Sequence, residues 1–189
     1  KSNDNLTDIA KKSNANLAKF YQYLSNMDKS VVVFRLQDLK SDIDKHEGNL
    51  VTEGSPTLLR NRIYIASGSG HIWGYNLDTD SIDWDYFVGS DIDGSPVVTQ
   101  DSCLLVTIEK QYIKGQGGVL KLDPRKQPAE AVEWFFPTED ASYSTWNGGV
   151  IGSTGINCGT KPKNTANLAV FTAIDGFMYV VNTDEIDEK

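Results

Sequence analysis

The chain has 189 residues, of which 39% are hydrophobic and 23% are charged, the composition of an ordinary globular domain. The net charge of −8 and the lack of any Lys/Arg cluster exclude the phosphate contacts that a nucleic-acid-binding protein needs. No apolar run approaches the roughly 18 residues that a transmembrane helix requires. We therefore expect neither a nucleic-acid partner nor a membrane span.

The N-terminal segment, residues 1–30, is predicted to be helical. Apolar residues recur at spacings of three and four between Leu6 and Met27, the pattern of an amphipathic helix. Such a helix either packs against the rest of the chain or presents its apolar face to a partner. The remaining residues, 31–189, have the character of β-structure throughout.

A short motif recurs along this β-rich region. GSPTLL begins at Gly54, GSPVVT begins at Gly94, and a variant, GSTGIN, begins at Gly152. The first two copies are forty residues apart. A fixed period of this size indicates a repeat architecture with one supersecondary unit per period.

The same register extends backwards from the first motif. At the same forty-residue offset, VVVFRLQDLKSDID from Val31 aligns with HIWGYNLDTDSIDW from His71, and Ser41 aligns with Ser81. Because the stretch from His71 reads as strands, we expect residues 31–53 to form the end of a preceding unit.

Each full unit predicts four short antiparallel strands, because apolar and polar residues alternate between turns rich in Gly, Asn, Asp and Ser. The expected strands are SPTLL, RIYIASG, IWGYNLD and IDWDYFVG in residues 54–93; SPVVT, CLLVTIE, GGVLKLD and AVEWFFPT in residues 94–151; and GSTGIN, LAVFTAIDG and FMYVVNTD in the partial unit 152–189.

We interpret this pattern as an all-β protein, a β-propeller of four-stranded antiparallel blades rather than a β-sandwich, because the units keep one internal order. Trp84 and Trp134 fall on outer strands, where we expect them to pack between neighbouring blades. Propellers close with about four to eight blades, and this chain holds about three and part of another. We expect a fragment of a larger ring; completion by another chain and an open stack are the alternatives.

The order of these elements resembles the quinoprotein-like propeller repeats, also called pyrroloquinoline-quinone-like repeats. The resemblance runs from Val31 to Asp184 and is carried by GSP…RIYIASGSGHIWGYNLD…IDW, GSP…LLVTIE…GGVLKLD…EWFFPT and GST…LAVFTAIDGFMYVVN. The Thr-Gly that usually precedes the Trp strand in this family is absent from both turns here. The resemblance implies a periplasmic or extracellular location.

In the enzymes of this family, pyrroloquinoline quinone lies on a Trp and under a disulfide between adjacent cysteines, with Ca²⁺ beside it. The cysteines of this chain, Cys103 and Cys158, are not adjacent, and no residue matches a cofactor ligand. We therefore predict no cofactor, although the resemblance leaves Ca²⁺ and pyrroloquinoline quinone open. The two cysteines are either buried thiols or a disulfide.

One candidate site is a cation site. SDIDG places Asp91 and Asp93 two residues apart before a glycine, a spacing that can present carboxylates to Ca²⁺. The alternative is that this stretch only turns the chain into the next strand.

A second candidate is the long connection between the second and third units, residues 137–149. It carries Tyr143, Trp146 and Asn147, and aromatic rings beside hydrogen-bonding side chains can stack on a sugar or cap a peptide. The alternative is that these rings only anchor the loop.

No catalytic constellation is found in the sequence. We expect a non-catalytic propeller module that serves as a scaffold or binds a protein or glycan, together with the rest of the ring or another chain that completes it. The alternative is a fragment of a pyrroloquinoline-quinone-dependent dehydrogenase whose active-site residues lie outside this chain. A further reading is association through open strand edges.

Overall fold

The computed structural model describes residues 40–48, 50–141, 148–157 and 166–184. The helix expected between Leu6 and Met27 and the strand expected from Val31 lie outside these residues. The described part is β-rich, and no helix in it is long and apolar enough to cross a membrane.

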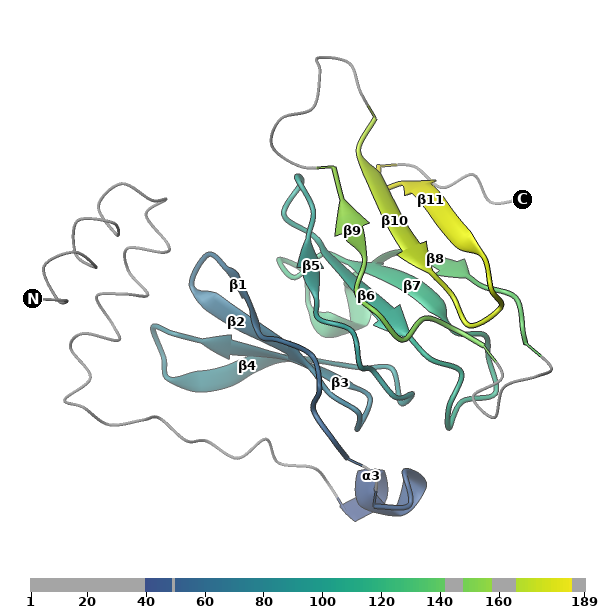
Figure 1. Cartoon of the computed structure of the whole chain (residues 1–189). Coiled ribbons are helices and arrows are strands. Elements are labelled where there is room, and N and C mark those ends of the chain that lie inside the picture. The colour runs from purple at the N-terminus through teal and green to yellow at the C-terminus, as the bar shows by residue number, and fades with distance from the viewer. Residues whose placement is uncertain (1–39, 49, 142–147, 158–165, 185–189) are drawn as a thin grey trace, which may run out of the picture.

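Strands make up most of the described elements (Figure 1). In chain order they are α3 (Lys40–Lys45), β1 (Thr57–Leu59), β2 (Arg62–Ala66), β3 (His71–Asn76), β4 (Ser81–Phe87), β5 (Val97–Val98), β6 (Leu104–Ile108), β7 (Gly118–Leu122), the 3-10 helix η1 (Pro128–Glu130), β8 (Val132–Pro137), β9 (Gly155–Ile156), β10 (Leu168–Thr172) and β11 (Met178–Asn182). They form three antiparallel sheets, β1-β2-β3-β4, β5-β6-β7-β8 and β11-β10-β9, which we call the first, second and third sheets.

The first two sheets match each other in detail. In both, the register between the third and fourth strands shifts at one place, between Gly74 and Tyr75 in the first sheet and between Lys121 and Leu122 in the second. A β-bulge of this kind increases the local twist of a sheet. The predicted repeat is therefore also a repeat of strand irregularities.

Apolar side chains fill the spaces between consecutive sheets. The core between the first and second sheets contains Tyr64, Ala66, Ile72, Trp84, Leu104, Val106, Ile108, Leu120 and Leu122. The core between the second and third contains Leu105, Val119, Val150, Ala169, Phe171 and Val181, with Trp134 and Phe136 against it. Since the second sheet is covered on both faces, every residue of β6 and β7 is buried, which explains their nearly continuous apolar sequences.

Two tryptophans join consecutive sheets, as the sequence predicted. Trp84 on β4 donates its indole N–H to the carbonyl of Lys126, in the turn after β7, at 3.0 Å. Trp134 on β8 donates in the same way to the carbonyl of Thr183, after β11, at 3.2 Å. Each indole therefore combines apolar burial with one hydrogen bond to the following sheet.

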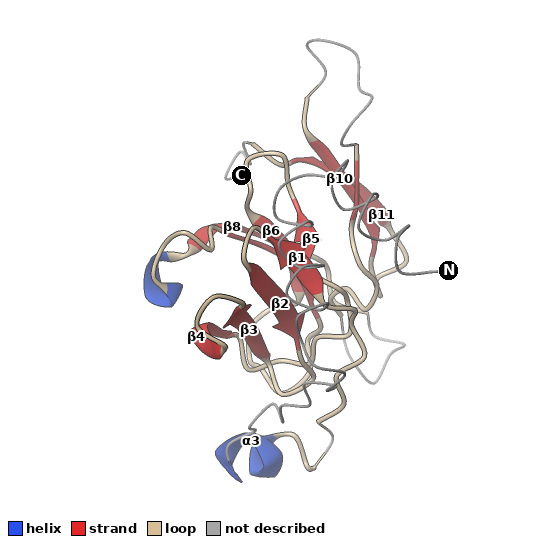
Figure 2. Cartoon of the chain, turned by 90° about the vertical axis from the view of Figure 1, so that its left-hand side faces the viewer, coloured by secondary structure: helices blue, strands red, loops and turns tan. Residues whose placement is uncertain are grey.

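The Gly-Ser motifs of the three sheets form a row. The backbone N–H of Ser55 donates to Oγ of Ser95 at 2.8 Å, and the N–H of Ser95 donates to Oγ of Ser153 at 2.8 Å. A Cβ at Gly54 would lie 3.0 Å from the carbonyl oxygen of Gly94, so the two backbones meet at glycine. The first strands β1 and β5 lie side by side (Figure 2).

The backward extension of the repeat is wrong at Ser41, because Lys40–Lys45 is helical whereas Ser81 begins the strand β4. The sequence KSDIDK lacks the apolar alternation of a strand, and Gly48 supplies a helix C-terminal signal. Gly48 has φ of +79° and donates its N–H to the carbonyl of Ile43 at 2.9 Å. In Figure 2 this helix lies at one end of the molecule, below the sheets.

Candidate functional site

The predicted loop site cannot be placed, because Tyr143, Trp146 and Asn147 lie outside the described residues, as does Cys158. Their role stays a prediction. Cys103 is a buried free thiol, and burial raises its pKa to about 11. A thiol with so high a pKa is a poor nucleophile at neutral pH.

The two predicted cation ligands lie on the connection from β4 to β5. Asp91 is buried and Asp93 is half-buried. Burial, followed by the charge of Asp93, raises the pKa of Asp91 to about 6. The connection is fixed to the end of β6 by Ser90, whose hydroxyl donates to the carbonyls of Glu109 and Gln111.

Glu109, which the sequence reasoning missed, completes this group of carboxyls. It follows β6 directly and is 2% exposed. Burial, a hydrogen bond with Asp93 and the charges of Asp93 and Asp91 raise the pKa of Glu109 well above its usual range. Ionising the Glu109 carboxyl is therefore less favourable than ionising an exposed glutamate.

The calcium prediction for Asp91 and Asp93 stays a prediction. Within the part of the chain that the structure describes, no three His, Cys, Asp or Glu side chains are grouped as metal ligands. Ca²⁺ takes about six to eight oxygen ligands. The one cysteine in the described ranges, Cys103, is a free thiol.

The third sheet has an apolar face that points away from the second sheet. Its outward side chains Met178, Val180 and Val170 are 67%, 57% and 39% exposed. Side chains on a strand alternate between the two faces of the sheet. The alternate residues of the same strands, including Phe171, pack on the second sheet.

Equivalent positions are buried in the other two sheets. We define positions as equivalent when they pair with the first strand of their sheet in the same way: Tyr64 with Thr57, Leu105 with Val97, and Val170 with Gly155. Tyr64 and Leu105 are 2% and 1% exposed because the following sheet covers them, whereas Val170 is open to solvent.

The neighbouring strand gives the same result. Ile72, Val119 and Met178 lie on the third strands of the three sheets and pair with Ala66, Thr107 and Thr172. Each of these partners comes two residues after the equivalent position of its own sheet, so the three pairs are equivalent as well. Ile72 and Val119 are fully buried, and Met178 is exposed. The third sheet thus presents the surface that the first two sheets use to receive their successor.

Among the described strands, β11 forms the edge of the third sheet. β3 and β7 each pair with a fourth strand, β4 and β8, whereas β11 pairs only with β10 among the described strands. An edge strand offers unpaired N–H and C=O groups to an incoming strand. This edge and the apolar face of the third sheet together form what we call the third-sheet face.

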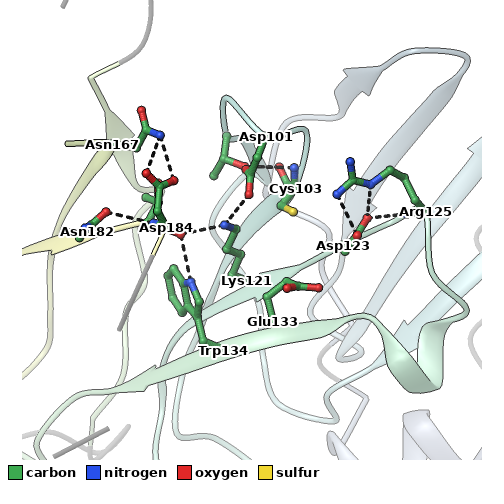
Figure 3. Close-up of polar contacts among 12 residues, drawn as sticks. Asp101, Cys103, Lys121, Asp123, Arg125, Glu133, Trp134, Asn167, Asn182 and Asp184 are labelled. Atoms are coloured by element: carbon green, nitrogen blue, oxygen red, sulfur yellow. Dashed lines mark hydrogen bonds and ion pairs between the residues drawn. The ribbon is translucent and has the colours of Figure 1, made fainter. Parts of the chain in front are cut away.

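The third sheet is held to the second by a buried cation (Figure 3). Lys121 is 4% exposed, and its Nζ donates to Oδ2 of Asp101 at 2.6 Å and to the carbonyl of Thr183 at 2.7 Å. Burial alone would raise the pKa of Asp101, but the hydrogen bond from Lys121 lowers it to about 2. Since Trp134 donates to the same carbonyl of Thr183, the third-sheet face has a fixed orientation.

Comparison of the sequence with protein-family models and with curated proteins gave no match. The third-sheet face is therefore the candidate site on the evidence of the structure alone.

Proposed function

We propose that this chain is a non-catalytic β-propeller module that binds another β-sheet through its third-sheet face. The observation that carries the proposal is the exposure of Val170 and Met178 at positions that are buried under the following sheet in the first two repeats. Large apolar residues gathered on one exposed face mark an interaction surface.

The repeated contacts between sheets support the propeller architecture. Each sheet donates the same two kinds of hydrogen bond to the sheet that follows it. One kind comes from an indole, Trp84 or Trp134, and the other comes from a backbone N–H, Ser55 to Ser95 and Ser95 to Ser153. A sandwich of two sheets has no such progression, whereas blades around an axis require it.

The partner is a protein rather than a glycan, because the face is apolar and its edge is a strand. A sheet from the rest of a ring, or from another chain, would bury the exposed side chains and pair with β11. The family resemblance adds a periplasmic or extracellular location to this proposal.

The test is the mass of the 189-residue chain in solution, measured by light scattering over a range of concentrations. We expect the chain to self-associate at high concentration because the third-sheet face is uncovered. Met178→Lys and Val170→Lys should shift the mass towards the monomer. Thr79→Lys, at an exposed turn of the first sheet, adds the same charge elsewhere and should leave the association unchanged.

A chain that stays strictly monomeric at high concentration would contradict the proposal. So would an association that Thr79→Lys disrupts as strongly as Met178→Lys, because the effect would then follow net charge and not the third-sheet face.

A further inference from the structure

A pocket of about 240 Å³ lies between the first and second sheets, away from the third-sheet face. Three turns and two strands bring its walls together: the end of β1, the β1–β2 turn, β2, the β5–β6 turn and the turn after β7. Its lining residues are Leu59, Arg60, Asn61, Arg62, Tyr64, Ser102, Pro124 and Arg125. The volume is smaller than the roughly 300–1,000 Å³ of pockets for drug-sized ligands, so it suits a small molecule.

The charge of this pocket opposes that of the chain. The sequence contains four arginines, and Arg60, Arg62 and Arg125 all line the pocket. No Asp or Glu is among its lining residues, although the chain as a whole carries −8. Guanidinium groups that line a pocket offer positive charge and hydrogen-bond donors to an anion.

Two of the guanidinium groups are fixed by carboxylates outside the lining. Arg62 donates from Nε and Nη2 to the two carboxylate oxygens of Asp83, both at 2.8 Å. Arg125 donates in the same way to Asp123, at 2.7 and 2.9 Å, as Figure 3 shows. Each pair uses two of the five guanidinium N–H groups, which leaves donors on the other edge for a ligand.

The third guanidinium carries the unmatched charge. Within the described residues Arg60 makes no ion pair, in contrast to Arg62 and Arg125. Arg60 also has φ of +58°, a left-handed conformation that Gly and Asn adopt more readily than Arg. The local backbone alone would therefore favour another residue type at this position, and ligand binding supplies a reason for Arg.

The remaining lining residues can contact the uncharged part of an organic ligand. Leu59 and Pro124 are apolar, and Tyr64 is an aromatic residue with a phenol group. Burial raises the pKa of Tyr64, so the phenol keeps its proton and remains able to donate to an anion.

We propose that this pocket binds the oxyanion of a small ligand, a carboxylate or a phosphate group, with Arg60 as the residue that pairs with it. The free edges of Arg62 and Arg125 provide the additional donors. This proposal is independent of partner binding at the third-sheet face, which lies on another sheet.

The test is calorimetric titration of the full chain with benzoate and, separately, with inorganic phosphate. Benzamide, which has the shape of benzoate without its charge, is the matched ligand control. We expect saturable binding of at least one anion, weakened by salt, and no binding of benzamide. Of the two anions, the one that binds more tightly identifies the source of the oxyanion.

Arg60→Asn should weaken anion binding about tenfold or more, because a charge-assisted hydrogen bond is lost. Since Asn tolerates the left-handed conformation, this variant should fold at least as stably as the parent chain. Lys114→Asn removes one positive charge at an exposed site outside the pocket and should bind the anion as the parent does.

Three results would overturn the proposal: no binding of either anion, equal binding by Arg60→Asn and the parent, or an equal loss in Lys114→Asn. The last would mean that net charge, and not the pocket, governs the interaction.

Discussion

The imidazole of His71 is joined to Asp42 through its Nε2, which lies 3.2 Å from Oδ2 of the carboxylate. This contact ties α3 to β3. The other ring nitrogen, Nδ1, lies 2.8 Å from Oδ1 of Asp85 on β4, so the ring stands between two acidic groups. Lys45 fixes the same helix by donating to the carbonyl of Gly89 at 2.7 Å.

The position of His71 predicts that the first sheet loses stability as pH rises. Burial alone would lower the pKa of His71, but the hydrogen bonds and charges of Asp85 and Asp42 outweigh it and raise the pKa above the usual value. The stabilisation is complete below about pH 6.5, where His71 is also protonated in the unfolded chain, and is lost as pH rises through the higher folded pKa.

Urea denaturation between pH 5.5 and about 8.5, compared between the parent chain and His71→Gln, isolates this contribution from the other titrating groups. The difference in the free energy of unfolding should shrink as pH rises. A difference that is constant with pH would show that folding leaves the pKa of His71 unchanged, and a difference that grows with pH would show that the folded chain favours the neutral form.

Glu109→Gln should stabilise the protein at alkaline pH. The raised pKa of Glu109 means that ionising this buried carboxyl beside Asp93 costs free energy, on the order of 1 kcal/mol or more. A neutral Gln can still donate to Asp93. Urea denaturation at about pH 8 should therefore give the variant the higher free energy of unfolding, with the advantage disappearing at about pH 5.

The opposite result, a variant less stable than the parent at alkaline pH, would indicate that the ionised carboxyl is stabilised by a cation. It would support the calcium prediction for Asp91 and Asp93.

Trp84→Phe and Trp134→Phe should destabilise the protein by similar amounts. Each removes one hydrogen bond to the carbonyl of the following sheet, which is worth about 0.5–1.5 kcal/mol, and part of the apolar area of the core. Chemical denaturation followed by circular dichroism measures both. Strongly unequal effects would contradict the equivalence of the two positions.

Gly94→Ala should destabilise the protein by about 1–3 kcal/mol, the usual range for overpacking. A Cβ there would lie 2.0 Å from Oγ1 of Thr107 and 3.0 Å from the carbonyl oxygen of Gly152. Gly115→Ala is the matched control, because its Cβ would meet nothing within 4 Å. If both variants have the same melting temperature, the close approach of the Gly-Ser motifs is not needed for stability.

The strands could be predicted from the sequence because each one carries a local signal. RIYIASG and IWGYNLD alternate in apolar character, and they form β2 and β3 with the expected antiparallel pairing. LLVTI is almost continuously apolar and forms β6, which is buried on both faces. The order of three such units predicted consecutive sheets joined by Trp84 and Trp134.

The pocket and the carboxyl group could not be predicted in the same way. Arg60 and Arg125 come from turns of different sheets, and only the stacking of these sheets brings them to one cavity. Glu109 lies near Asp93 because the connection from β4 to β5 passes the end of β6. The two-residue spacing of Asp91 and Asp93 in the sequence gives no sign of this contact. The helix at Lys40 departs from the repeat register because strand-like alternation does not continue into KSDIDK.

The row of serines has a direction. Each backbone N–H reaches the hydroxyl of the sheet that follows, from Ser55 to Ser95 and from Ser95 to Ser153, so the row has a donor end and an acceptor end. A sheet that extends it beyond Ser153 must arrive head to tail and present a hydroxyl. Contacts of this heterologous kind close into rings or run on as filaments. A two-fold dimer, by contrast, would leave the row without an extension.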